Sequence, residues 1–188
     1  RDRGLLDLDA PVARYLPGFT MLSPEYAQIT TRHLLSHSSG LPGTSMRDAF
    51  AFEPIPGYAA HAEAALADQH LKHLPGELAV YCNDGFTMIE RLVAALARQD
   101  YASFVQANIL TPLDMADSSF LTKKPTGGSF ALPYSNGRQY PQEFVNPLAT
   151  GGLTATPGDM MKLARMLLER GVYQSRRIVS ADGIAQMG

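Results

Sequence analysis

Two side chains separated by one residue, Tyr81 and Asn83, are the groups in this sequence best suited to chemistry. They lie between a Pro75-Gly76 turn and a long amphipathic stretch. At the start of a helix, the phenol and the amide would project into the same small volume. A phenol can transfer a proton and an amide can bind a substrate carbonyl or amide, so the pair suits acyl transfer. Neither side chain supplies a nucleophile.

The helix that must position this pair is expected to begin with Asn83 or Asp84 as its N-cap. Its apolar residues repeat at the spacing of one buried helical face, namely Phe86, Ile89, Val93 and Leu96. An Ala-rich segment, 58–74, is expected to form the preceding helix, because Pro75-Gly76 is a strong helix stop. The structural alternative for the pair is an aromatic ring packed on a helix start beside an Asx-type cap.

A helix with two histidines is expected earlier in the chain. Thr30 or Thr31 is a natural N-cap, and Gly40 would end the element. His33 and His37, four residues apart, would share one face of this helix and could bind a metal. No third ligand is evident, so helix packing and hydrogen bonding near the cap is the preferred interpretation.

The pattern Tyr-x-Asn occurs a second time, at Tyr134 and Asn136. There, Asn136-Gly137 between short flanks predicts a β-hairpin, and no amphipathic helix follows. Tyr81 is therefore the preferred motif tyrosine, and Tyr134 remains the alternative.

Two more helices are predicted from caps. Asp100 is expected to start a short helix, and Thr156 with Pro157 in the first turn is expected to start another. Three residues would form the apolar face of the later helix, Met160, Leu163 and Leu167, and the methionines at 160, 161 and 166 are expected to fill the core.

Composition limits the function classes. The 188 residues suffice for one domain with a core, and the net charge of −2 excludes a strongly basic, nucleic-acid-binding surface. One cysteine excludes an internal disulfide framework and a multi-cysteine zinc site. No apolar run approaches the roughly 20 residues of a membrane-spanning helix.

Four stretches of the chain resemble a known superfamily when they are read in order. They are GLLDLDAPVARYLP at 4–17, ITTRHLLSHSSGLP at 29–42, PGELAVYCNDGF at 75–86 with PLDM at 112–115, and GGLTAT at 151–156 with DM at 159–160. Together they resemble the serine β-lactamase and penicillin-binding-protein superfamily, in its class C-like branch of β-lactamase-related hydrolases and esterases.

The resemblance implies an α+β fold of the β-lactamase/transpeptidase type, of which this chain supplies mainly the helical subdomain and a few short strands. It implies a serine hydrolase that acts through an acyl-enzyme on an amide or ester: a β-lactam, a D-amino-acid peptide or a small ester. Tyr81 would be the catalytic phenol, and Asn83 would bind the substrate. No metal or cofactor is expected, the oligomeric state stays open, and a periplasmic or secreted location is favoured by analogy.

Two motifs of that superfamily are missing. No serine here has Lys three residues on, so the nucleophilic Ser-x-x-Lys is absent, and Lys124-Pro125-Thr126-Gly127 is only a misplaced near match to the late Lys-Thr-Gly. Residues 1–188 are therefore expected to be the central part of one β-lactamase-like domain, with the nucleophile upstream and late sheet strands downstream. Such a chain alone would be inactive and would expose apolar surface. The alternative is a non-catalytic helical binding module or an inactive homologue.

Overall fold

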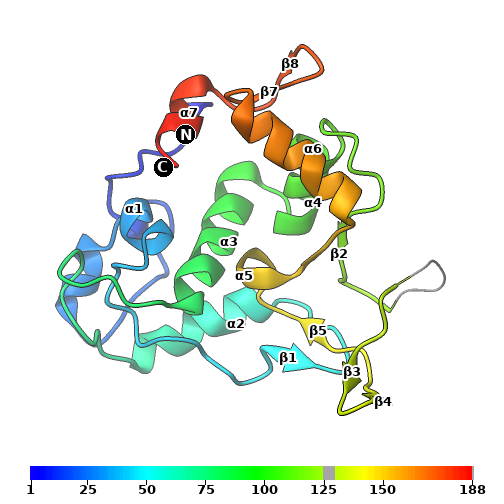
Figure 1. Cartoon of the computed structure of the whole chain (residues 1–188). Helices are drawn as coiled ribbons and strands as arrows, with labels where there is room; N and C mark the ends of the chain where they lie inside the picture. Colours follow the sequence, from blue (N-terminus) through cyan, green and yellow to red (C-terminus); the bar gives the residue numbers. More distant parts are fainter. Residues whose placement is uncertain (125–129, 188) are drawn as a thin grey trace.

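One helix, α3 (Asn83–Ala97), lies at the centre of the computed structural model, which describes residues 1–124 and 130–187 (Figure 1). Four shorter helices pack against it: α1 (Thr31–Leu35), α2 (Tyr58–Ala65), α4 (Tyr101–Val105) and α5 (Leu148–Gly151). The start of α3 and the helices around it therefore position the Tyr81 and Asn83 pair.

The other helical elements lie further along the chain or at its edges. They are η1 (Val12–Arg14), η2 (Pro24–Gln28), η3 (Leu66–Asp68), the π-helical turn η4 (Gln106–Leu110), α6 (Pro157–Leu168) and α7 (Ala181–Ala185). The two chain ends are side by side (Figure 1), because the Asp2 carboxylate accepts hydrogen bonds from the Ser180 N–H at 2.8 Å and hydroxyl at 2.7 Å.

Strands occur as four antiparallel pairs of two residues each. They are β1 (Phe50–Ala51) with β5 (Phe144–Val145), β2 (Ser119–Phe120) with β6 (Leu153–Thr154), β3 (Tyr134–Ser135) with β4 (Arg138–Gln139), and β7 (Val172–Tyr173) with β8 (Arg176–Arg177). Isolated two-stranded pairs are marginal in water, so the helical packing must supply most of the stability. No helix in the described ranges is long and apolar enough to cross a membrane.

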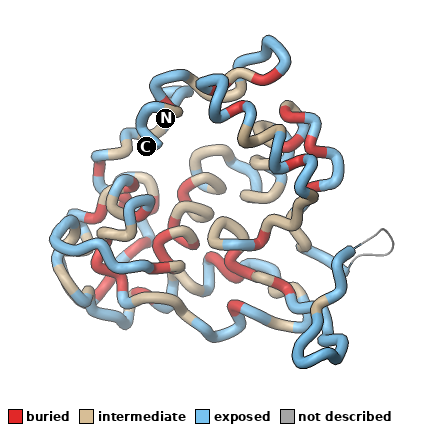
Figure 2. Tube along the Cα trace, in the orientation of Figure 1, coloured by how far each residue is buried: buried red, intermediate tan, exposed pale blue. Residues whose placement is uncertain are grey.

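The buried hydrophobic residues include two core regions, and Figure 2 shows further buried positions along α2 and β5. The first region joins the N-terminal connector to α1 and α3 and includes Val12, Phe19, Ile29, Leu34, Met88 and Leu92. The second region lies under α6 and includes Leu110, Leu113, Met115, Met166 and Tyr173. Each region is continuous apolar packing, which is the main favourable term in folding.

Several local predictions are confirmed. The Thr30 hydroxyl accepts from the His33 N–H at 3.2 Å, so Thr30 rather than Thr31 caps α1. The Asp100 carboxylate caps α4 by accepting from the Ser103 N–H at 2.8 Å. Thr156 likewise caps α6. The predicted hairpin at 134–139 is present as β3 and β4.

The predicted cap of α3 is wrong. Its N-cap is Cys82, which makes no capping bond through its side chain, and Asn83 is the first helical residue. Asp84 does not cap because its carboxylate accepts from the Ser45 N–H at 2.9 Å instead. The predicted buried face is also rotated: Met88 and Leu92 are the fully buried apolar residues, whereas Phe86, Ile89, Val93 and Leu96 are half-buried.

Three other helix predictions need correction. The helix predicted over 58–74 ends at Ala65, with η3 after it, because the Gln69 carbonyl and the Lys72 N–H bond to other segments. The α1 helix ends at Leu35, well before Gly40, and His37 has a left-handed φ of 57°. His33 and His37 therefore do not share a helical face.

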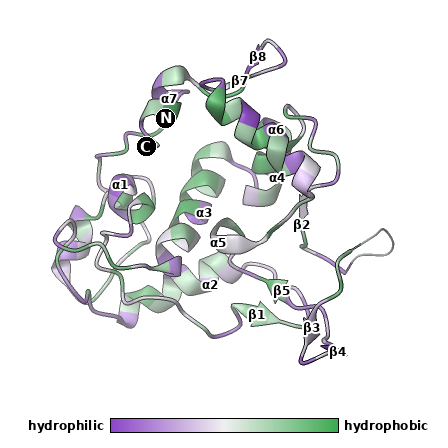
Figure 3. Ribbon diagram, viewed as in Figure 1, coloured by the Kyte–Doolittle hydropathy of each residue, from purple (hydrophilic) through white to green (hydrophobic). Residues whose placement is uncertain are grey.

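The apolar face predicted for α6 is largely exposed. Of the three residues predicted for that face, Met160 is 42% and Leu167 is 39% exposed, whereas Leu163 is half-buried against the second core region. Of the other two methionines expected in the core, Met166 is buried at 2% and Met161 is 68% exposed. Figure 3 shows hydrophobic residues along α6. Of the near match at 124–127, residues 125–127 lie outside the described residues.

Candidate functional site

Tyr81 lies on the protein surface just before α3, where 66% of it is exposed. Its ring stacks on the His37 imidazole with 4.6 Å between ring centroids and an interplanar angle of 34°. Phe86 contacts the same imidazole at 5.2 Å. The phenol is thus supported by a neighbouring ring while it stays open to a ligand.

His37 holds the backbone on both sides of Tyr81. The His37 carbonyl accepts from the Val80 N–H at 2.9 Å, and its Nδ1 accepts from the Cys82 N–H at 3.1 Å. An Nδ1 that accepts must be unprotonated, so the neutral ring carries its proton on Nε2. One residue in a left-handed conformation therefore fixes the segment that carries the phenol. The sequence alone does not predict this role of His37, because its hydrogen bond to the Cys82 N–H joins residues 45 positions apart.

Asn83 is half-buried at the first position of α3. Its Oδ1 is buried and has no hydrogen-bond partner among the described residues. Its backbone N–H donates to Thr44 Oγ1 at 3.4 Å, and its carbonyl accepts from Thr150 Oγ1 at 3.2 Å. A buried acceptor without a donor costs about 1–3 kcal/mol. A ligand N–H at this position would remove that cost.

The two residues around Asn83 attach the loop at 43–45 to the helix start. The Cys82 thiol donates to the Gly43 carbonyl at 2.9 Å, and both Asp84 carboxylate oxygens accept from the Ser45 N–H, at 2.9 and 3.1 Å. Burial raises the pKa of the Cys82 thiol and the pKa of Asp84. Cys82 is therefore held as a thiol with a structural role.

The short helix α5 lies across α3 and is held at two points. Thr150 contacts the Asn83 carbonyl, and the Ala149 N–H donates to Glu90 Oε2 at 3.2 Å. Burial raises the pKa of Glu90 to about 7. Sequence analysis missed Glu90. The sequence feature that could have identified Glu90 is its place on the apolar side of the helix, four residues after Phe86 and three before Val93.

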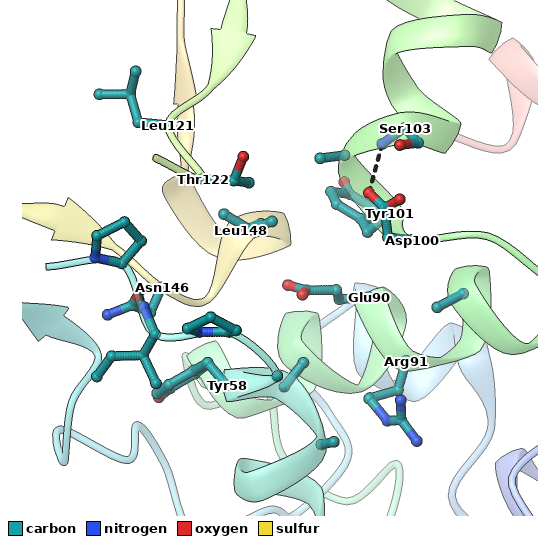
Figure 4. Close-up of a pocket in the computed structure, with 18 residues that line it drawn as sticks. Tyr58, Glu90, Arg91, Asp100, Tyr101, Ser103, Leu121, Thr122, Asn146 and Leu148 are labelled. Atoms are coloured by element: carbon teal, nitrogen blue, oxygen red, sulfur yellow. Dashed lines mark hydrogen bonds between the residues drawn. The ribbon is translucent and has the colours of Figure 1, made fainter. Parts of the chain in front are cut away.

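A cavity of about 560 Å3 opens beside Glu90, two turns along α3 from Asn83 (Figure 4). Tyr81 and Asn83 do not line it. Among the described residues, no group of three or more His, Cys, Asp or Glu is placed to hold a metal ion. The structure therefore has two separate polar features on one helix, the exposed phenol with its neighbouring amide and the Glu90 cavity.

Proton transfer by the Tyr81 phenol, at the corner that it forms with Asn83, would depend on nearby cations. A phenol acts as a base near neutral pH only where cations favour its phenolate form. The cation–π contacts found in the described parts of the chain are Arg3 on Phe104 and Arg14 on Tyr15, neither of which is at this corner. The second Tyr-x-Asn has a different setting, because Tyr134 is exposed on β3 and Asn136 is in a hairpin turn with a φ of 51°.

Comparisons with known proteins show the family and the fold of this chain. The Beta-lactamase family model matches residues 1–187. Penicillin-binding protein 4 of Amycolatopsis lactamdurans is 29% identical over 99% of this chain and 51% of its own length. The D-alanyl-D-alanine-carboxypeptidase/endopeptidase AmpH of Escherichia coli is 26% identical over 92% of this chain and 45% of its own length. A D-stereospecific amidohydrolase from Streptomyces sp. has a TM-score of 0.75 at 22% identity, covering 99% of this chain and 58% of that one.

The fold is the α+β fold of serine β-lactamases and penicillin-binding proteins, as the sequence predicted, and this chain contributes mostly helices and short strand pairs to it. The chain belongs to the Beta-lactamase family. It spans about half the length of the curated relatives reported above, at 51% and 45%.

Proposed function

We propose that residues 1–188 are the central part of a longer serine hydrolase that acts through an acyl-enzyme on an amide or ester. The observation that carries the proposal is the corner at the start of α3. There, the exposed Tyr81 phenol lies two residues before Asn83, whose side-chain oxygen has no hydrogen-bond partner among the described residues. In this proposal a serine attacks the substrate carbonyl, and the nucleophilic Ser-x-x-Lys lies on polypeptide outside this sequence.

Tyr81 would transfer the proton between the serine, the leaving group and water. The lysine of Ser-x-x-Lys would supply a cation that favours the phenolate. Asn83 Oδ1 would accept a hydrogen bond from a substrate amide N–H. Because that oxygen is buried and has no partner among the described residues, the Asn83 side chain would have to turn toward the substrate before this bond could form.

An apolar groove supports the proposal that more polypeptide packs here. It has a volume of about 410 Å3, and apolar side chains dominate its lining, including Leu5, Leu6, Leu35, Val93, Leu96 and Phe104. Val93 and Leu96 belong to the face of α3 that was predicted to be buried and is only half-buried. We take this groove as the surface against which the remaining part of the hydrolase packs.

The proposed substrates are a β-lactam, a D-amino-acid peptide or a small ester. The names of two relatives, a D-alanyl-D-alanine-carboxypeptidase/endopeptidase and a D-stereospecific amidohydrolase, favour an amide formed by a D-amino acid. An Asn83 that accepts a substrate N–H fits an amide better than an ester, because an ester has no such donor.

The test is an expression product extended upstream of Arg1 until it includes a Ser-x-x-Lys and downstream of Gly188 until it includes the late sheet strands. We expect a fluorescent penicillin or a nitrophenyl ester to acylate it, and Tyr81→Phe to slow the acylation about a hundredfold or more. Tyr134→Phe is the matched control, with the same change at the other Tyr-x-Asn, and should have little effect. Equal losses in the two variants would contradict the role of Tyr81.

A second function, a non-catalytic binding module or inactive homologue, is motivated by the absence of Ser-x-x-Lys from these residues. The gene sequence upstream of Arg1 separates the two. A Ser-x-x-Lys there supports the hydrolase, whereas a start codon directly before Arg1 supports the module. The 188-residue chain alone is expected to remain unlabelled by a fluorescent penicillin under either proposal.

A further inference from the structure

The cavity beside Glu90 is built from five segments that are far apart in the sequence. Its walls include Pro54, Pro56, Tyr58, Tyr101, Leu121 and Leu148. A volume of about 560 Å3 is in the usual range for sites that bind small molecules. Its lining suits a ligand with an apolar body, because prolines, leucines and aromatic rings are among the side chains that form it.

The walls are held in place without a ligand. The Asn146 side chain accepts from the Ile55 N–H at 2.8 Å and donates to the Asp48 carbonyl at 2.8 Å, which fixes the proline-containing segment beside β1. The Tyr101 ring packs edge-on against Phe120, with 5.5 Å between centroids. The cavity is therefore largely preformed, and binding would require little ordering of the protein.

The Glu90 carboxylate points into this space, toward Leu148 and away from Arg91 (Figure 4). It accepts one hydrogen bond from the Ala149 N–H, and a carboxylate has about four acceptor sites, so it retains acceptors for a ligand. The Glu90 charge acts on two tyrosines that line the cavity. Burial, and after it the charge of Glu90, raise the pKa of Tyr101. Glu90 is also one of the charges that raise the pKa of Tyr58.

The charges around Glu90 leave the cavity negative. Arg91, the cation on the same helix, pairs with Glu63 of α2. Asp100, at the start of α4, is held ionised because hydrogen bonds from Ser103 lower its pKa. Glu90 and Asp100 both line the space, and the Arg91 guanidinium that also lines it is paired with Glu63. The group that complements such a wall is a cation.

We propose that this cavity binds a small organic ammonium ion, a protonated primary amine with an apolar body. The ammonium would donate to the Glu90 carboxylate, and the body would pack against the prolines and leucines. The Tyr101 ring would add a cation–π contact if the ammonium lies over its face. The site is separate from the acyl-transfer corner and does not depend on the proposed hydrolase activity.

The test uses the 188-residue chain, labelled with 15N, and two probes of almost the same shape. Phenethylamine carries the cation, and 2-phenylethanol is its neutral analogue. At pH 8 the amine should shift the backbone signals of Glu90, Tyr101 and Ala149. It should bind about tenfold or more tightly than the alcohol, because the alcohol can still donate a hydrogen bond to the carboxylate but carries no positive charge. At pH 6 about one tenth of Glu90 is ionised, so the amine should bind about tenfold more weakly than at pH 8.

Two variants and one control complete the test. Glu90→Gln should weaken the amine about tenfold at pH 8 and remove its pH dependence. Ala94→Leu, which fills the cavity but keeps the carboxylate, should weaken both probes. Glu169→Gln removes the same charge from an exposed position at the end of α6 and should bind the amine as the wild type does. Equal affinity for the two probes, unchanged affinity in Glu90→Gln, or no binding up to the solubility limit of the amine would each overturn the proposal.

Discussion

Replacement of Glu90 by Gln should stabilise this chain above neutral pH and leave its stability unchanged in acid. Burial raises the pKa of Glu90 from an ordinary 4.5 to about 7. The folded protein therefore holds a proton that the unfolded chain has already released. Stability from this group is fully present below pH 4.5 and is lost as the pH rises through 7.

The magnitude follows from that difference. At about 1.4 kcal/mol for each pH unit, the rise from 4.5 to about 7 corresponds to about 3 kcal/mol lost by the wild type between pH 4 and pH 8. Gln has nearly the same shape, and its Oε1 can still accept from the Ala149 N–H. Glu90→Gln should therefore exceed the wild type by up to about 3 kcal/mol at pH 8 and match it at pH 4.

Urea unfolding followed by far-ultraviolet circular dichroism at pH 4, 5, 6, 7 and 8 measures this difference. Subtracting the variant from the wild type at each pH isolates Glu90 from the other groups that titrate in the same range. Glu143→Gln, at an exposed carboxylate outside the ion pairs of the described residues, should run parallel to the wild type. A wild type and Glu90→Gln whose stabilities also run parallel from pH 4 to pH 8 would refute the burial argument.

Three more predictions follow from local contacts. His37→Asn keeps a hydrogen-bond acceptor and tolerates the left-handed φ of 57°, whereas His37→Leu does neither. The Cys82 amide hydrogen should therefore exchange with solvent roughly five- to tenfold faster in the Leu variant than in the Asn variant. Equal exchange rates would contradict the role of His37. Gly40→Ala should lower the free energy of unfolding in urea by more than about 2 kcal/mol, because the new Cβ would lie 2.1 Å from the His73 carbonyl oxygen at a φ of 78°. Gly18→Ala, where a Cβ would lie in open space, should change the free energy of unfolding little. In the same urea unfolding, Thr156→Ala should lower the free energy of unfolding by about 1 kcal/mol, and Thr156→Ser should lower it much less, because Ser keeps the hydroxyl that caps α6. Equal losses in the two variants would show that the cap is not the cause.

The elements decided by neighbouring residues were predictable from the sequence. Asp100 and Thr156 cap their helices through bonds to residues three positions on, so no distant part of the chain is involved. Asn136-Gly137 likewise forms a hairpin because both residues accept positive φ, at 51° and 74°. The position of α3 also followed from its own apolar repeat.

The wrong predictions of helix caps and helix ends have a common physical cause. A group far away in the sequence forms the hydrogen bond that the local helix would otherwise have formed. Asp84 has the residue type of a cap, but Ser45, 39 residues earlier, supplies the donor that it binds. The helix predicted over 58–74 stops early because Gln69 and Lys72 bond to Leu22 and Gly40. No window of sequence around these residues contains their partners.

Burial along α6 was also beyond local reasoning. An apolar repeat indicates which residues could be buried, but the surroundings decide which ones are. Met166 packs into the second core region, while Met161 stays 68% exposed on the same helix. The Met160, Met161 and Leu167 surface is consistent with the proposal that further polypeptide covers part of this chain.

The short helix α5 connects the two polar features of the molecule. On α3, Asn83 and Glu90 are seven residues apart, which places them on one side of the helix two turns from each other. Each holds α5 through a different residue, Thr150 for the Asn83 carbonyl and Ala149 for the Glu90 carboxylate. The backbone at the start of α3 is therefore fixed partly by a buried acid about 10 Å away along the helix. Because Gln at position 90 keeps the bond to Ala149, it can alter the charge of the cavity without releasing α5 from the proposed acyl-transfer corner.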